Sequence, residues 1–160
     1  MDLLAEGTKA PLFTLLNQNE EKIKLADLLK THDFTVVYFY PKAMTPGCTV
    51  QACAITENQT KFKKNKIAIV GISNDPVKKL KKFEEKYQLS FDLLSDEDHQ
   101  VCSDYGVWGE KKMMGRTYMG INRVSYILNN KGKIIHVMKK VDTKTHHQDI
   151  LNLIKELQDK

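Results

Sequence analysis

Two cysteines in one short segment, Cys48 and Cys53, are the residues of this sequence best suited to do chemistry. Cys48 follows Pro46 and Gly47, which break the chain after the apolar run 34–40 and precede a predicted helix. A cysteine at a helix N-terminus faces unpaired backbone N–H groups and a partial positive charge, and both favour the thiolate. Because the thiolate is the nucleophile, this placement predicts a reactive Cys48. The alternative interpretation is a small buried apolar residue.

The spacing of the two cysteines excludes a disulfide on an intact helix. A five-residue step rises about 7.5 Å and turns about 140°, which separates the Cα atoms by about 8–9 Å. A disulfide needs these atoms within about 7 Å. If Cys48 and Cys53 form a catalytic pair, the first turns of the helix must therefore unwind. The alternative for Cys53 is a helix residue that faces the core, since spacing alone is weak evidence.

Hydrophobic patterning predicts the elements that position this segment. The apolar runs 34–40 and 67–73 are typical of strands buried on both faces. A helix is expected from about 48 to 65, and Asp75 and Pro76 are expected to open the next helix as its N-cap and first helical residue. The remaining predictions are strands at 11–16, 22–25, 91–94, 123–128 and 134–141, helices at 26–30, 99–105 and around 150–157, a hairpin turn at 129–132 and a loop at 107–120.

This order of elements predicts the fold class. Strands that alternate with helices indicate a parallel sheet, and the late hairpin 123–141 adds an antiparallel edge. We therefore expect an α/β protein with a thioredoxin-like fold. Its central mixed sheet would be flanked by helices, and residues 11–25 would form an N-terminal β-hairpin extension. A length of 160 residues suits one domain spanning 1–160.

Composition and charge exclude several classes of protein. Hydrophobic residues make up 41% and charged residues 28% of the chain, which is not the composition of a fibrous or disordered protein. The net charge of +5 is a mild excess, so the basic runs 61–66 and 78–82 are interpreted as solvated faces and no nucleic-acid partner is expected. No apolar run approaches the ~18 residues of a membrane helix, and no secretory signal is recognised at the start. These features predict a cytoplasmic protein with no membrane partner.

The remaining cysteine and the histidines show no metal-binding spacing, so neither a metal nor a cofactor is expected. The adjacent His146 and His147 point to different helix faces and are interpreted as surface residues near the start of the last helix. Cys102 is interpreted as a partly buried, inert thiol on a short helix. The methionines of the predicted loop 107–120 are interpreted as core packing, or alternatively as the lining of the site's mouth.

The segment YFYPKAMTPGCTVQAC, residues 38–53, resembles the peroxiredoxins, and more narrowly those of the PrxQ or bacterioferritin comigratory protein type. The peroxiredoxin pattern Pro-x-x-x-Thr-x-x-Cys is present as Pro41, Thr45 and Cys48. The similarity extends from about Gly7 to the final helix. It includes the stretches LLSD at 93–96 and YGVWGE at 105–110, which lead to Arg123.

The resemblance implies a thiol peroxidase that reduces hydrogen peroxide and organic hydroperoxides. Cys48 would be the peroxidatic cysteine, oxidised to a sulfenic acid, and Cys53 the resolving cysteine that forms a disulfide with it in the same subunit. Thr45 and Arg123 would complete the site, and Pro41 would shield it. Thioredoxin or a similar dithiol would be the reductant. Because the cysteine pair is self-contained, a monomer is expected.

Arg123 and the class of protein each have an alternative interpretation. A guanidinium beside the end of strand 34–40 can pair with a thiolate and with negative charge developing on a peroxide oxygen, but a surface arginine at a strand end is the alternative. A thiol–disulfide oxidoreductase on the same fold is disfavoured because a reductase needs both sulfurs on one rigid turn. A non-enzymatic basic binding module is the third possibility.

Overall fold

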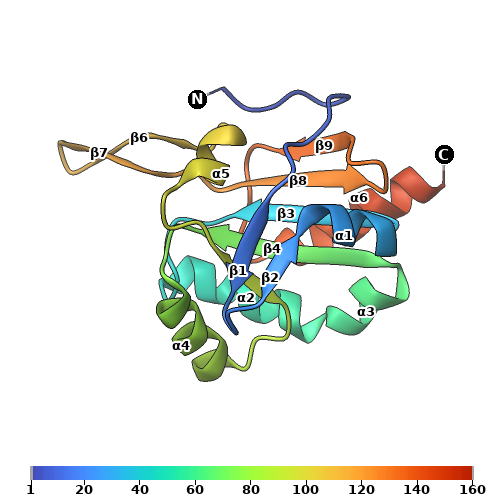
Figure 1. Ribbon diagram of the computed structural model, residues 1–160, viewed down its shortest axis with the longest axis horizontal. Helices are drawn as coiled ribbons and strands as arrows, with labels where there is room; N and C mark the ends of the chain where they lie inside the picture. The colour runs from blue at the N-terminus through green and yellow to red at the C-terminus, as the bar shows by residue number, and fades with distance from the viewer. Residues whose placement is uncertain (1, 160) are drawn as a thin grey trace.

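The computed structural model describes residues 2–159, which form strands and helices in the alternating order expected (Figure 1). The strands are β1 (Thr14–Asn17), β2 (Lys22–Lys24), β3 (Phe34–Phe39), β4 (Ile67–Ser73), β5 (Asp92–Ser95), β6 (Trp108–Met113), β7 (Arg116–Ile121), β8 (Val124–Asn129) and β9 (Ile134–Met138). The helices are α1 (Leu25–Thr31), α2 (Pro46–Glu57), α3 (Gln59–Lys64), α4 (Val77–Tyr87), α5 (Gln100–Asp104) and α6 (His146–Gln158).

Seven strands form the central mixed sheet, in the order β2-β1-β5-β4-β3-β8-β9. The central strand β3 pairs parallel with β4 and antiparallel with β8, so that Phe39 lies opposite both Ile72 and Val124. The hairpin β8–β9 forms one antiparallel edge, and the N-terminal hairpin β1–β2 joins the other edge through β5. The mixed sheet and the N-terminal hairpin are both as the sequence predicts.

Two apolar layers cover the two faces of this sheet, which explains the unbroken apolar runs of its central strands. Alternate residues of β3 point to opposite layers: Val37 and Phe39 join one layer, while Val36 and Tyr38 join the other. The first layer contains buried residues of α1 and α5, and the second contains buried residues of α2, α3, α4 and α6. The reactive segment is therefore carried on the four-helix side.

The helices after β3 and β4 begin and end differently from the sequence prediction. The helix expected at 48–65 starts two residues earlier and is broken at Asn58, whose side-chain Nδ2 donates to the carbonyl of Ala54. Asp75 is not an N-cap: Pro76 occupies the N-cap position and α4 starts at Val77. The Asp75 carboxylate instead accepts a hydrogen bond from Ala43 N–H in the loop that leads to α2, which is a tertiary contact that the sequence does not reveal.

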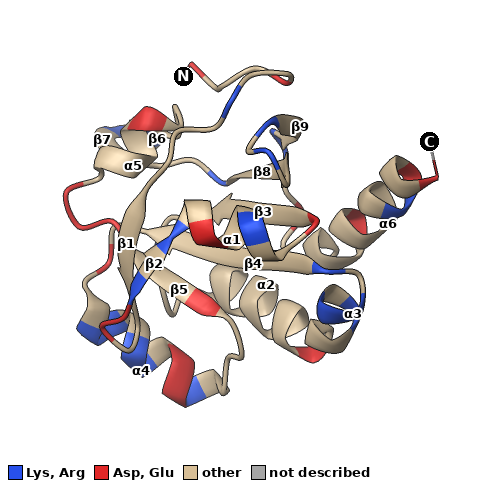
Figure 2. Cartoon of the chain, turned by 45° about the vertical axis from the view of Figure 1, so that its right-hand side comes forward, with Lys and Arg blue, Asp and Glu red and all other residues tan. Residues whose placement is uncertain are grey.

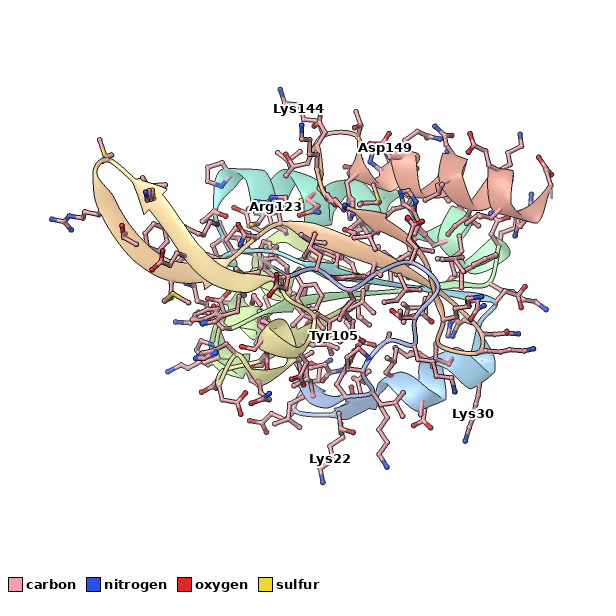
Figure 3. The ribbon with its side chains drawn as sticks, turned by 90° about the horizontal axis from the view of Figure 1, so that it is seen from above. Lys22, Lys30, Tyr105, Arg123, Lys144 and Asp149 are labelled. Atoms are coloured by element: carbon pink, nitrogen blue, oxygen red, sulfur yellow. The ribbon has the colours of Figure 1, made fainter. Side chains whose placement is uncertain are left out.

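Residues 108–121 form a β-hairpin, not the loop that was expected. Strands β6 and β7 are joined by Met114 and Gly115, whose positive φ angles of 51° and 78° fit a two-residue turn of the type that matches strand twist. The hairpin extends away from the sheet (Figures 1 and 3), and Met114 at its tip is 97% exposed. The interpretation of these methionines as core packing is therefore wrong.

The basic run on α4 is a solvated face. Figure 2 shows acidic and basic residues side by side on this helix, and Lys81 forms an ion pair with Glu84 at 2.9 Å. Such interspersed charges do not make the large basic surface that nucleic-acid binding needs. None of the helices between residues 2 and 159 combines the length and apolar character that crossing a membrane requires.

Candidate active site

The loop between β3 and α2 places Cys48 in the first turn of α2. Thr45 is the N-cap in an extended conformation, and Pro46 occupies the first helical position, where a missing N–H costs nothing. Thr49 N–H donates to the Thr45 carbonyl at 2.9 Å and closes the first helical bond. Cys48 therefore lies among the N–H groups that a helix leaves unpaired at its positive end, as its sequence position predicts.

Arg123 brings a second positive charge to the sulfur of Cys48. Its Nη2 lies 3.3 Å from Cys48 Sγ, in hydrogen-bonding contact. This contact arises because β8 pairs antiparallel with β3, which places Arg123, just before β8, beside the end of β3 (Figure 3). The helix end and the guanidinium are therefore both placed to stabilise negative charge on Sγ, and Arg123 is partly buried against the cysteine.

Cys48 is nearly enclosed, with 2% of its surface exposed. Charges in such a site are screened less by water than at the surface, so the Arg123 contact is strengthened. Enclosure also restricts what can reach the sulfur while α2 is folded.

A buried chain of polar groups holds Arg123 in place. Arg123 Nη1 donates to Gln51 Oε1 at 2.7 Å, and Gln51 Nε2 lies 3.0 Å from His146 Nδ1. His146 Nε2 in turn lies 2.7 Å from Ser125 Oγ. Gln51 is 1% exposed and His146 is fully buried. The interpretation of His146 as a surface residue is therefore wrong, because α6 packs its first turn against α2 and the sheet.

These polar residues were missed in the sequence, and only one had a recognisable signal. Gln51 follows Cys48 by three residues, so both lie on one face of α2. This spacing signals that the polar side chain of Gln51 belongs to the surroundings of Cys48. His146 and Ser125 carry no such local signal. Burial lowers the pKa of His146 to about 3, with further lowering by the charges of Arg123 and His147, so the ring is neutral.

The other predicted site residues lie in the loop between β3 and α2. Thr45 Oγ1 donates to the Lys42 carbonyl at 2.9 Å, which leaves its oxygen available as an acceptor for a substrate hydroxyl. Pro41 is half-buried at the start of the loop. Ala43 N–H donates to Asp75 Oδ2 at 2.7 Å, and this buried bond anchors the loop to the end of β4.

Cys53 lies five residues beyond Cys48 on the continuous helix α2, and all three cysteines are free thiols. Cys53 is half-buried, and its pKa is raised by burial and then by the charge of Glu57. Cys102 is fully buried, and burial together with Asp96 raises its pKa strongly. Cys102 is thus more deeply buried than predicted, and its thiol is inert.

The fold and the cysteine site define the class of the protein as a thioredoxin-fold thiol peroxidase, and comparisons with known proteins agree. The model of the AhpC/TSA family matches residues 7–137. Peroxiredoxin Bcp of Escherichia coli strain K12 is 50% identical over 156 residues, which cover 98% of this chain and 99% of the relative. The chain therefore belongs to the AhpC/TSA family.

Solved structures place it among the Bcp and PrxQ peroxiredoxins. The PrxQ of Xylella fastidiosa superposes with a TM-score of 0.91 at 25% identity, covering 99% of each chain. The bacterioferritin comigratory protein of Xanthomonas campestris, solved as trapped intermediate and ligand complexes bearing on its alkyl peroxide reduction, gives 0.83 at 30% identity over 90% of each chain. The peroxidase predicted from the resemblance is confirmed. These comparisons favour the peroxidase over the two alternatives, a thiol–disulfide oxidoreductase and a basic binding module.

Proposed function

We propose that Cys48 is the peroxidatic cysteine and that it reduces hydrogen peroxide and organic hydroperoxides. The observation that carries this proposal is the 3.3 Å contact between Arg123 Nη2 and Cys48 Sγ at the N-terminus of α2. The alkyl peroxide reduction associated with the Xanthomonas campestris relative supports the organic substrates. No cofactor is needed, because sulfur itself accepts the oxygen atom.

In the first step the Cys48 thiolate attacks the terminal oxygen of the peroxide. The O–O bond breaks, its electron pair leaves with the hydroxide or alkoxide, and Cys48 becomes a sulfenic acid. Donors from Arg123 and from the backbone N–H of Cys48 stabilise the charge that develops on the two oxygens. Thr45 Oγ1 accepts a hydrogen bond from the peroxide hydroxyl, and Pro41 shields the site from water.

In the second step Cys53 attacks the sulfenic acid, water leaves, and a Cys48–Cys53 disulfide forms. The five-residue spacing requires the first turns of α2 to unwind. Burial raises the pKa of Cys53 while the helix is folded, so its thiolate is disfavoured until unwinding exposes it. A dithiol reductant, which we propose to be thioredoxin, then returns both thiols by disulfide exchange.

Three single substitutions test this assignment. We expect Cys48→Ser to abolish peroxide consumption, and Cys53→Ser to allow one turnover that stops at the sulfenic acid, detected by a sulfenate-specific probe and mass spectrometry. Cys102→Ser is the matched control and should turn over normally. Normal thioredoxin-dependent turnover by Cys48→Ser would refute the assignment.

The self-contained cysteine pair also supports a monomer. We further propose that the chain acts as one domain over residues 1–160 and that it is a cytoplasmic protein. Light scattering coupled to gel filtration measures the mass in solution, in both the reduced and the oxidised protein. Replacing thioredoxin by a glutaredoxin–glutathione system in the turnover assay separates the two classes of dithiol reductant. Faster turnover with glutaredoxin would overturn the choice of thioredoxin.

A further inference from the structure

We propose that His146 is a positioning residue that fixes the side-chain amide of Gln51, and through it both the Arg123 guanidinium and the folded state of α2. This inference rests on the proposed function of Cys48 and Cys53. It starts from the buried chain Cys48–Arg123–Gln51–His146–Ser125, whose successive contacts are 3.3, 2.7, 3.0 and 2.7 Å. His146 is fully buried, so water cannot replace it.

The orientation of the Gln51 amide decides whether Arg123 is held. An amide has one accepting and one donating end, and a guanidinium only donates. Gln51 must therefore turn Oε1 toward Arg123, which leaves Nε2 to donate to His146. A flipped amide would place its NH₂ group against the guanidinium, and the hydrogen bond between Gln51 and Arg123 would be lost.

His146 anchors this orientation of the amide by accepting a hydrogen bond from Gln51 Nε2. To accept from Gln51 Nε2, Nδ1 must carry no proton, so the ring proton is on Nε2 and is donated to Ser125 Oγ. The lowered pKa of His146 agrees with a neutral ring that presents one acceptor and one donor. The guanidinium, which only donates, thus sets the orientation of the Gln51 amide, His146 anchors that orientation through Nδ1, and Ser125 Oγ, which can donate or accept, receives the remaining ring N–H.

The same contact ties α2 to the rest of the molecule. Gln51 lies between Cys48 and Cys53 on α2, while its partners lie on α6 and at the start of β8. Unwinding that brings the two cysteines together displaces Gln51 and breaks its bonds to Arg123 and His146. His146 therefore favours the folded helix that reacts with peroxide and opposes the unwound helix that forms the disulfide.

The two elementary steps should consequently respond in opposite directions when His146 loses its acceptor. In His146→Leu we expect the rate constant for oxidation of Cys48 by peroxide to fall by about tenfold, as for a lost buried hydrogen bond. The rate constant for disulfide formation should rise, by up to about the same factor. Rapid-mixing fluorescence and quenched mass spectrometry measure the two steps separately in a single turnover.

Two further variants keep the test independent of folding defects. His146→Asn supplies a side-chain oxygen near the position of Nδ1 and should restore much of the oxidation rate. Ser125→Ala leaves the ring in place but removes the acceptor of its Nε2–H, so ¹⁵N NMR should show a perturbed Nε2–H form together with a smaller change in the same two rates. His147→Leu, the neighbouring half-buried histidine, is the matched control and should leave both rates unchanged.

The outcomes separate this inference from the function it rests on. Opposite changes in the two steps, with rescue by His146→Asn, support a positioning role. If His146→Leu and Ser125→Ala are folded and change neither step, or slow both steps alike, the inference is overturned. The proposed function stands in that case as long as Cys48→Ser remains inactive, because that variant does not involve His146.

Discussion

Arg123 makes two contacts that depend on the fork of its guanidinium. Nη2 meets the sulfur of Cys48 at 3.3 Å and Nη1 meets Gln51 Oε1 at 2.7 Å. A lysine ammonium carries the same charge, but it is a point on a flexible stem and cannot make both contacts with fixed geometry. The site therefore depends on the forked geometry of the Arg123 guanidinium as well as on its charge.

Arg123→Lys tests whether geometry or charge dominates. We expect the rate of Cys48 oxidation by peroxide to fall by roughly 10²-fold, which is typical for losing an oriented donor to a developing anion. Single-turnover kinetics measure this rate. Arg116→Lys, on the exposed β6–β7 hairpin, is the matched control and should behave as wild type. A near-normal rate in Arg123→Lys would show that charge alone suffices.

At the scale of elements, the helix α2 must serve two states. In the folded state it places Cys48 at its positive end, and its continuous run Pro46–Glu57 keeps Cys53 too distant for a disulfide. In the proposed Cys48–Cys53 disulfide its first turns cannot remain helical. On this proposal one sequence has to support both a helix and an opened segment.

Oxidation with one equivalent of peroxide should reduce the far-ultraviolet helix signal, because the Cys48–Cys53 disulfide holds the start of α2 open. Circular dichroism before and after oxidation measures the change, and dithiothreitol should reverse it. Cys53→Ser, treated identically, should retain its helix signal. An unchanged spectrum in the wild-type disulfide form would contradict the unwinding step.

The loop before α2 depends on one buried carboxylate. Asp75 Oδ2 accepts from Ala43 N–H at 2.7 Å and from Ser73 Oγ at 2.9 Å, while Oδ1 pairs with Lys79 at 3.3 Å. The first two bonds are buried, and the ion pair is partly exposed on the solvent side. The anchor of the loop is therefore the pair of buried bonds.

Asp75→Ala should lower the free energy of unfolding by about 1–3 kcal/mol, since it leaves a buried N–H without a partner, and it should also slow Cys48 oxidation. Urea unfolding and single-turnover kinetics measure the two effects. Lys79→Met removes only the ion pair and should cost less than about 1 kcal/mol. Equal losses in the two variants would assign the effect to the ion pair instead.

At the scale of the whole molecule, burial of His146 links stability to pH. The pKa of His146 falls from its ordinary 6.5 to about 3 in the fold. Above pH 6.5 the ring is neutral in both the folded and the unfolded chain, so the contribution of His146 to the free energy of unfolding is fully present. As the pH falls toward 3, the unfolded chain binds a proton that the fold excludes, and stability is lost.

The free energy of unfolding should therefore drop by about 2 kcal/mol between about pH 7 and about pH 5 through this residue alone. Urea titrations at the two pH values measure the drop. His146→Asn should show a smaller drop, while His147→Leu should resemble wild type. Equal drops in His146→Asn and wild type would assign the acid sensitivity to other groups.

The strands and the reactive segment were predictable because their causes are local. The runs that became β3 and β4 read as buried strands since helices cover both faces of the sheet. The β6–β7 hairpin was missed because its residues mix apolar and charged types without regular alternation, and its Met114–Gly115 turn carries no strong hairpin signal. The role of Asp75 was missed because a tertiary contact claimed its carboxylate.

The sequence alone determined that a cysteine stands where a buried strand gives way to a helix, since that depends only on neighbouring residues and backbone chemistry. Only the tertiary structure decided what surrounds the sulfur. Arg123 meets Cys48 across 75 positions and His146 meets Gln51 across 95 positions of the chain. These contacts follow from the register of β8 on β3 and from the packing of α6, and no local pattern encodes either.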